Sequence, residues 1–177
     1  MSKFDRLFAK AKEYQTSTYL RKFVARDFQL MVRAEAGALE IPVAFVDADG
    51  TIGWNHSYLG ECTCVTCGKV GPWKGGTSAA GGGMHTGHFI ASRCNSIVLE
   101  ENNVAPQCAR CNLYGGGEQE KFTIWMRAVR GQDEIDRLRE LKTTVRKFNK
   151  EELVVLRIGY MNRLKRAKEV IDAAATT

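Results

Sequence analysis

Two closely spaced pairs of cysteines constrain what this chain can fold into more than any other feature of its sequence. The first pair is "CVTC", Cys64 and Cys67, and the second is "CARC", Cys108 and Cys111, with forty residues between them. Each Cys-x-x-Cys turn can direct two thiolates at one ion, and two such turns complete the four-sulfur tetrahedron of a structural zinc site. We therefore expect a closed zinc site that stabilises the fold and leaves no coordination position open for catalysis.

Other interpretations of the cysteines are open. Cys62 competes with Cys64 as a ligand because "CTC" offers both, and the two-residue gap to Cys67 favours Cys64. Cys94 is either a small buried hydrophobic residue or an alternative ligand. The two pairs could also be redox-active or buried independently. A redox Cys-x-x-Cys normally occurs once, at the start of a helix after a strand, so the repeated spacing favours zinc.

Charge and hydropathy indicate the kind of partner that the chain has. It has 177 residues, 44% of them hydrophobic, which suffices for one ordinary core with a helical appendage. A formal net charge of +6 and a pI near 9.1 favour a polyanionic partner over an acidic substrate. No run of about eighteen apolar residues and no signal-peptide core is present, so we expect a soluble, cytoplasmic chain without a membrane partner. In that compartment, close cysteine pairs are more often metal ligands than disulfides.

Hydrophobic periodicity divides the chain into three segments. Residues 1–59 are expected to form one or two helices, with Ser2 as N-cap and a break near "QTST", and then a hairpin that turns at "DADG". Residues 60–117 hold both cysteine pairs and a loop too poor in apolar residues to fold alone. Residues 118–177 are expected to be helical, with Asn149 capping the last helix. The expected fold is α+β, with a zinc-stabilised core between these two flanking segments.

Two histidines, His85 and His88, lie in "HTGHF" just before the second cysteine pair. Two histidines three residues apart beside a glycine are harder to explain by packing than a lone histidine. Phosphodiester hydrolysis needs a base that activates water and a cation that stabilises charge on the phosphorane and the leaving oxygen. An imidazole can be that base at neutral pH, and a second imidazole with amide oxygens can hold the cation.

The stretch from "HTGHF" to "NVAPQCARCN" resembles the motif of the ββα-metal, or HNH, endonucleases. That motif has a histidine on a strand, a central Asn in the connecting loop, and a last His or Asn at the start of a helix. In its zinc-knuckle branch the central Asn lies five residues before the third cysteine and the last residue follows the fourth, as Asn103 and Asn112 do here. The chain is still more similar to the phage NinG/Rap recombination endonuclease family, through "CVTCGK", "GHF", "QCARCN" and a helical tail, over about residues 60 to 140.

The resemblance implies a role for each residue of the motif. His88 would be the general base, and His85 and Asn112 would bind a catalytic Mg or Mn ion. Asn103 would orient the His88 ring by hydrogen bonding, and Asn102 is the alternative for that role.

The chain departs from the HNH pattern at two positions. Many HNH enzymes place an acid or a histidine directly before the general base, where this chain has Gly87, and other branches place a third ligand where it has Gly116. The catalytic cation would thus have few protein ligands and would be completed by water and the scissile phosphate. Such binding suits Mg or Mn better than a second zinc ion.

The expected function is metal-dependent cleavage of DNA, and the resemblance implies branched or recombination-intermediate DNA as substrate in a bacterial host cell. Arg93 and Arg110 could approach phosphate near the cation, and a homodimer would suit cutting of both strands. Trp73 could stack on an unpaired base, but a cap over the zinc site is the favoured interpretation. The alternative function is that of a non-catalytic zinc-knuckle protein that binds DNA.

Overall fold

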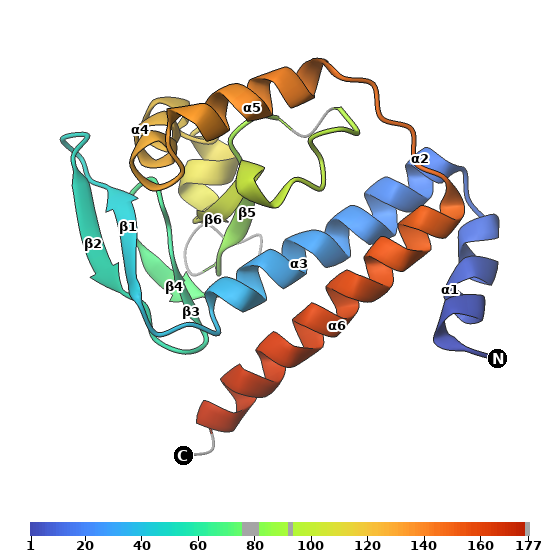
Figure 1. The fold of residues 1–177 in the computed structure, drawn as a ribbon. Helices are drawn as coiled ribbons and strands as arrows, with labels where there is room; N and C mark the ends of the chain where they lie inside the picture. Colours follow the sequence, from blue (N-terminus) through green and yellow to red (C-terminus); the bar gives the residue numbers. More distant parts are fainter. Residues whose placement is uncertain (76–81, 92–93, 176–177) are drawn as a thin grey trace.

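The computed structural model describes residues 1–75, 82–91 and 94–175 and has a mixed α+β architecture, as the sequence predicts (Figure 1). Within these residues, helices from both ends of the chain pack around three small antiparallel sheets.

The N-terminal segment is helical and breaks where the sequence predicts. Ser2 caps the first helix, because its hydroxyl accepts a hydrogen bond from the Asp5 backbone N–H and the Asp5 carboxylate accepts one from the Ser2 N–H. The backbone becomes extended at Gln15, with φ −61° and ψ 147°, before the next helix begins. A π-helical turn, which the sequence did not indicate, joins the second and third helices. These elements are α1 (Lys3–Lys12), α2 (Thr16–Tyr19), η1 (Leu20–Val24) and α3 (Ala25–Ala36).

Six strands pair two by two in the described residues. The first pair is the hairpin predicted around "DADG", and the Asp47 carboxylate closes its turn by accepting a hydrogen bond from Thr51 Oγ1 at 2.6 Å. The pairs are β1 (Pro42–Val46) with β2 (Ile52–His56), β3 (Glu61–Thr63) with β4 (Val70–Pro72), and β5 (His85–His88) with β6 (Val104–Gln107). A 3-10 helix, η2 (Glu101–Asn103), leads into β6, and a π-helical turn, η3 (Arg110–Tyr114), follows it.

The C-terminal segment is helical, as predicted. Asn149 caps the last helix, since its side-chain oxygen accepts a hydrogen bond from the Glu152 N–H at 2.7 Å. The helices are α4 (Gln119–Val129), α5 (Gln132–Thr143) and α6 (Lys150–Ala174).

The longest helix, α6, lies beside α3 and runs parallel to it (Figure 1). Arg157 of α6 donates to the Asp27 carboxylate of α3 at 2.7 Å and to the Tyr19 hydroxyl at 3.2 Å. The rings of Phe28 and Tyr160 pack with centroids 5.2 Å apart. The two ends of the chain therefore form one helical layer.

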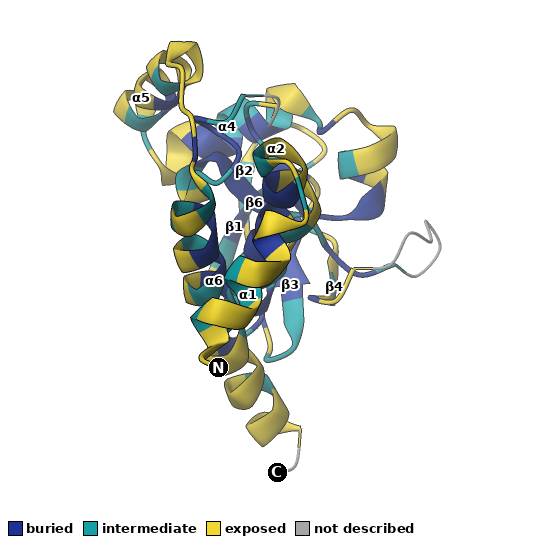
Figure 2. Ribbon diagram, turned by 90° about the vertical axis from the view of Figure 1, so that its right-hand side faces the viewer, coloured by how far each residue is buried: buried dark blue, intermediate teal, exposed yellow. Residues whose placement is uncertain are grey.

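The buried side chains of the described residues gather in clusters that combine all three predicted segments. One cluster joins the N-terminal helices to α6 and to Val104 of β6, a second joins β1 and β6 to α4 and α5, and a third surrounds the cysteines. Figure 2 shows β6 in the interior, while α5 and the far end of α6 are largely exposed. No described helix is both long enough and apolar enough to cross a membrane.

Candidate functional site

The four predicted cysteine ligands come together. Cys64 and Cys67 follow β3, Cys108 follows β6, and Cys111 lies on η3. Their Sγ atoms all lie within 4.8 Å of one another, which brings thiols from two distant stretches of chain around a volume that could hold a zinc ion. In the described part of the chain, no other cluster of three or more His, Cys, Asp or Glu side chains has such geometry. The position of the structural zinc site is therefore as the spacing predicts.

The other two cysteines are not part of this cluster. The Cys62 thiol donates to the Arg33 carbonyl at 3.3 Å, and burial raises its pKa to about 12, so that it stays protonated. Cys94 packs at the edge of the apolar cluster that contains Phe122. The choice of Cys64 over Cys62, and the interpretation of Cys94 as a small hydrophobic residue, agree with these contacts.

The cysteine thiols are coupled to one another through hydrogen bonds. Donation from the Cys111 and Cys67 thiols lowers the pKa of Cys64, while the hydrogen bonds of Cys111 with Cys64 and Cys67, together with burial, raise the pKa of Cys111. The Cys64 thiolate thus forms more readily than that of Cys111, whose charge a bound cation would compensate. Metal binding here must release protons.

Trp73 belongs to the cysteine site as a cap. It is 5% exposed and shares a cluster with the cysteines and Met84. The ammonium groups of Lys74 and Lys168 lie 5.5 and 5.8 Å from the centroid of its ring. A buried ring of this kind is not available to stack on a base, so the structure supports the favoured interpretation of Trp73 as a cap over the zinc site.

The two candidate catalytic histidines lie on strand β5 of the β5–β6 hairpin. His85 pairs with Gln107 and His88 pairs with Val104. Because side chains alternate along a strand, His85 faces one side of the hairpin and His88 the other. The His88 side is that of the N-terminal helices, since Val104 packs in their cluster.

His88 has the chemical state that a general base requires. The ring donates a hydrogen bond to the Val98 backbone carbonyl, which leaves Nε2 as the nitrogen with a lone pair. Within the part of the chain that the structure describes, this Nε2 is buried and has no hydrogen-bond partner. Burial lowers the pKa of His88 below 6.5, and the positive charge of Arg21 lowers it further, against the Val98 hydrogen bond. The imidazole is therefore neutral at physiological pH.

Asn103 is fully buried and organises the loop after β5. Its Oδ1 accepts from the Ile90 N–H at 2.8 Å, and its Nδ2 donates to the carbonyls of Ile90 at 2.9 Å and Ile97 at 3.5 Å. These bonds connect the two ends of the loop that carries Val98, the acceptor for His88. The expected hydrogen bond from Asn103 to the His88 ring is replaced by this arrangement, in which Asn103 acts through the loop.

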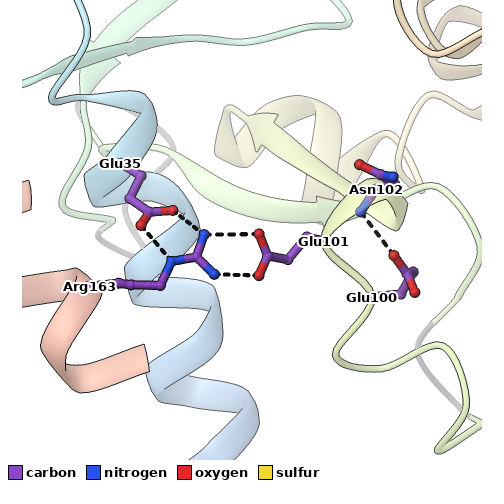
Figure 3. A network of polar contacts seen from close by, with 5 residues as sticks. All are labelled: Glu35, Glu100, Glu101, Asn102 and Arg163. Atoms are coloured by element: carbon purple, nitrogen blue, oxygen red, sulfur yellow. Dashed lines mark hydrogen bonds and ion pairs between the residues drawn. The ribbon is translucent and has the colours of Figure 1, made fainter. Parts of the chain in front are cut away.

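Asn102, the alternative for that role, points elsewhere. Its side chain hydrogen-bonds to Glu134 of α5 and contributes to the lowered pKa of that carboxyl group, after the larger effect of Arg137. Its backbone N–H donates to Glu100 at 3.4 Å (Figure 3). Asn103 is thus the better candidate of the two.

Gly87 is required by a contact that the sequence did not reveal. A Cβ atom at this position would lie 2.0 Å from Oε1 of Gln107, which is itself fully buried. Gln107 donates from Nε2 to Thr66 Oγ1 at 3.1 Å and to the Gly117 carbonyl at 2.8 Å. The space where many HNH enzymes carry an acid or a histidine is therefore occupied by an amide that connects the two cysteine knuckles.

The remaining predicted residues are less closely grouped. Asn112 is half-buried on η3, which lies against β5, and its N–H donates to the Cys108 carbonyl at 2.9 Å. Arg110 is exposed on the same turn, and Arg93 lies outside the described residues. The convergence of His85 and Asn112 on one cation with His88 stays a prediction, because the strand alternation separates the two histidines.

An arginine of α6 is connected to the segment that leads into β6. Arg163 donates from Nε and Nη2 to Glu35 of α3, at 2.8 and 2.7 Å, and also pairs with both carboxylate oxygens of Glu101 (Figure 3). Glu101 begins η2, and Asn103 ends it. The long C-terminal helix thus supports the loop that positions His88.

Comparison with known proteins gave one family. The family model described as "Bacteriophage Lambda NinG protein" matches residues 58–170, which include both cysteine pairs, the β5–β6 hairpin and most of the C-terminal helices. Comparisons with curated proteins and with solved structures gave no match.

Proposed function

The chain belongs to the NinG family of bacteriophage lambda, and from that membership and the geometry of the β5–β6 hairpin we propose that it is a metal-dependent endonuclease of the HNH type. Membership of the family suggests a function related to phage recombination. We propose branched or recombination-intermediate DNA as the substrate, cleaved by hydrolysis of the phosphodiester bond.

The observation that carries this proposal is the environment of His88. One ring nitrogen is occupied by the Val98 carbonyl, and the other carries a lone pair without a partner among the described residues. A half-buried, neutral histidine whose unpaired Nε2 is fully buried is costly for a protein that only binds DNA, since an unpaired buried nitrogen stabilises nothing. It is useful for an enzyme, because Nε2 can accept the proton of an attacking water.

The chemistry of the nearby donors fits a weakly held divalent cation. His85 offers an imidazole and Asn112 an amide oxygen, a mixed set that Mn accepts and that Mg completes with water and phosphate oxygens. When bound, such an ion would supply charge stabilisation for the leaving oxygen. The residues of this chain would orient the base, through Asn103 and its loop, and hold the hairpin against the zinc-stabilised knuckles.

A second function has one observation in its favour. His85 and His88 face opposite sides of the hairpin, and a non-catalytic zinc-knuckle protein needs no convergence of the two histidines on one cation. Such a protein would bind DNA through the same basic residues without cutting it.

The experiment that separates the two functions is cleavage of labelled linear duplex and four-way-junction DNA with Mg or Mn. Wild type is compared with His88→Ala and with the control His56→Ala, which removes a histidine from the hairpin strand β2. We expect His88→Ala to lose cutting while it keeps one zinc per chain and its affinity for DNA, and His56→Ala to cut normally. Tight binding of both DNAs by wild type without cutting under either cation would favour the binding function.

A further inference from the structure

The charges of this chain are segregated along its sequence. The first 33 residues carry eight Lys or Arg against three Asp or Glu, a net charge of +5. Residues 34–68 carry no Lys or Arg and five acidic residues, a net charge of −5. The overall charge of +6 therefore hides one strongly basic segment beside an acidic one.

The structure places these two segments at opposite ends of α3. The basic side chains nearest to the start of α3 lie on η1 and the first turn of α3, whereas the acidic segment forms the hairpin and the first cysteine knuckle beyond the other end (Figure 1). The family model begins at residue 58, so the basic helices lie outside the part of the chain that it matches.

Three of these basic side chains are exposed on consecutive turns. Arg21 and Lys22 lie on η1, and the Arg26 side chain is 62% exposed on α3. Among the described residues, the ion pair recorded for Arg26 is a long one, 3.4 Å, with Asp27, a carboxylate already paired with Arg157 at 2.7 Å. The charge of Arg26 is therefore largely uncompensated.

The N-terminal helices pack over the β5–β6 hairpin through α3, which η1 directly precedes. Val24 of η1 shares an apolar cluster with Val98 and Val104, which are the acceptor residue for His88 and its partner across the hairpin. Leu20 lines a cavity of about 350 Å³ together with Asn95 of the loop after β5 and with Lys147. Arg21 is close enough for its charge to act on the His88 ring. The basic turn thus lies beside the candidate base.

We propose that the N-terminal helices form the surface that binds the phosphate backbone of a nucleic acid beside His88, through Arg21, Lys22 and Arg26 with Lys147 at its edge. This inference rests on the proposed function, and it names where the polyanion lies. Guanidinium groups pair with phosphate oxygens through two parallel hydrogen bonds, and clustered cations gain affinity by releasing counterions. The acidic hairpin repels the same polyanion, which confines the nucleic acid to the His88 end of α3.

The test is a pair of variants with equal loss of charge. The first combines Arg21→Gln, Lys22→Gln and Arg26→Gln. The control combines Lys165→Gln, Arg166→Gln and Lys168→Gln, three exposed cations at the far end of α6 from η1 (Figure 1). Binding to fluorescent four-way-junction and duplex DNA is measured by anisotropy, without Mg or Mn, between 50 and 200 mM salt. Zinc content and thermal unfolding are measured for both variants.

We expect the first variant to bind DNA at least about tenfold more weakly. The slope of log Kd against log salt concentration should fall by about 2 to 3, because each phosphate contact contributes about 0.9 to that slope. The control should change Kd less than about threefold. Lys147→Gln, on a separate segment, should weaken binding in the same direction, which keeps the test decisive if the triple variant unfolds.

Equal weakening in the two triple variants, or stronger weakening in the control, would overturn the inference, because charge alone would then explain binding. Absence of DNA binding by wild type would overturn it too. Binding that depends on the N-terminal cations without any cleavage would leave this surface standing and reject the nuclease, so the two proposals can fail separately.

Discussion

Gly87 and Gln107 show how the identity of one residue can be constrained by a side chain from the neighbouring strand. Gly87→Ala would place a methyl group 2.0 Å from Gln107 Oε1, in a fully buried position where Gln107 is already held by two hydrogen bonds. We expect this variant to lose about 1–3 kcal/mol of unfolding free energy through overpacking, as measured by urea denaturation of the zinc-loaded chain.

The matched control for that variant is Gly159→Ala on α6, where an added Cβ meets nothing within 4 Å. In a helix interior this change should stabilise the chain by about 0.5–1 kcal/mol. If the two variants shift unfolding in the same direction, the proposed contact between Gly87 and Gln107 is wrong.

His88 should make both stability and activity depend on pH. Burial and Arg21 lower its pKa in the folded chain below the value of 6.5 that applies when it is unfolded. The unfolded chain then binds a proton more readily, so stability from this group is present above pH 6.5 and is lost as pH falls through the lower folded pKa. In an NMR titration of zinc-loaded protein, a His88 midpoint at or above 6.5 would contradict this.

At the residue scale, spacing to Cys108 favoured Asn103 over Asn102 as the residue that orients His88, but it did not indicate the partners that Asn103 has in the structure. The position of Asn103, five residues before Cys108, can be read from the sequence, whereas its hydrogen bonds to Ile90 and Ile97 depend on how the loop folds back. Arg21 was missed for a similar reason. Only the packing of the N-terminal helices on the hairpin brings it near His88, although the basic character of the first 33 residues was a usable signal.

The two cysteine knuckles are the elements whose removal should affect the whole fold. Structural zinc contributes on the order of 10–16 kcal/mol in isolated zinc fingers, and this chain has apolar clusters elsewhere. We expect Cys67→Ser to lose bound zinc and to unfold at a lower temperature, and a chelator to have the same effect on wild type. Zinc content and thermal unfolding are the measurements.

Cys62→Ser is the control for the knuckles. A serine hydroxyl can still donate to the Arg33 carbonyl that the Cys62 thiol contacts at 3.3 Å, so zinc should remain bound at one ion per chain. If Cys62→Ser lost its zinc and Cys67→Ser retained it, Cys62 would be a zinc ligand and Cys67 would not.

The helices and the first hairpin were predictable because each depends on local signals. Ser2 and Asn149 cap helices at the expected places, and "DADG" forms the expected turn. The π-helical turns were not predictable, since one extra residue in a turn leaves the apolar pattern nearly unchanged. The pairing of β5 with β6 was implied only by the family resemblance, because fifteen residues separate the two strands.

At the scale of the whole molecule, the first and last segments of the chain form one layer that supports the hairpin. In the sequence these two segments look independent of each other, because the cysteine-rich region lies between their apolar patterns. The structure joins them through ion pairs between α3 and α6, among them Arg163 with Glu35, and Arg163 also pairs with Glu101 of η2 (Figure 3). Such long-range pairs leave no periodic signal in the sequence, and therefore the shared clusters could not be predicted.

The buried pair Arg157 and Asp27 is the contact on which this joining should depend most. The two side chains are 10% and 7% exposed, 2.7 Å apart, and come from positions 130 residues apart in sequence. Arg157→Ala would leave the buried Asp27 carboxylate with only its long, 3.4 Å contact to Arg26, and breaking a buried pair in this way typically costs about 3–5 kcal/mol. The exposed pair of Arg139 with Asp136 provides the comparison, because Arg139→Ala should change the unfolding free energy by less than about 1 kcal/mol.

Urea denaturation of both zinc-loaded variants measures the difference. Equal losses would mean that the Arg157–Asp27 pair contributes little to holding α3 and α6 together, and that their apolar contacts and the Arg163–Glu35 pair do so instead.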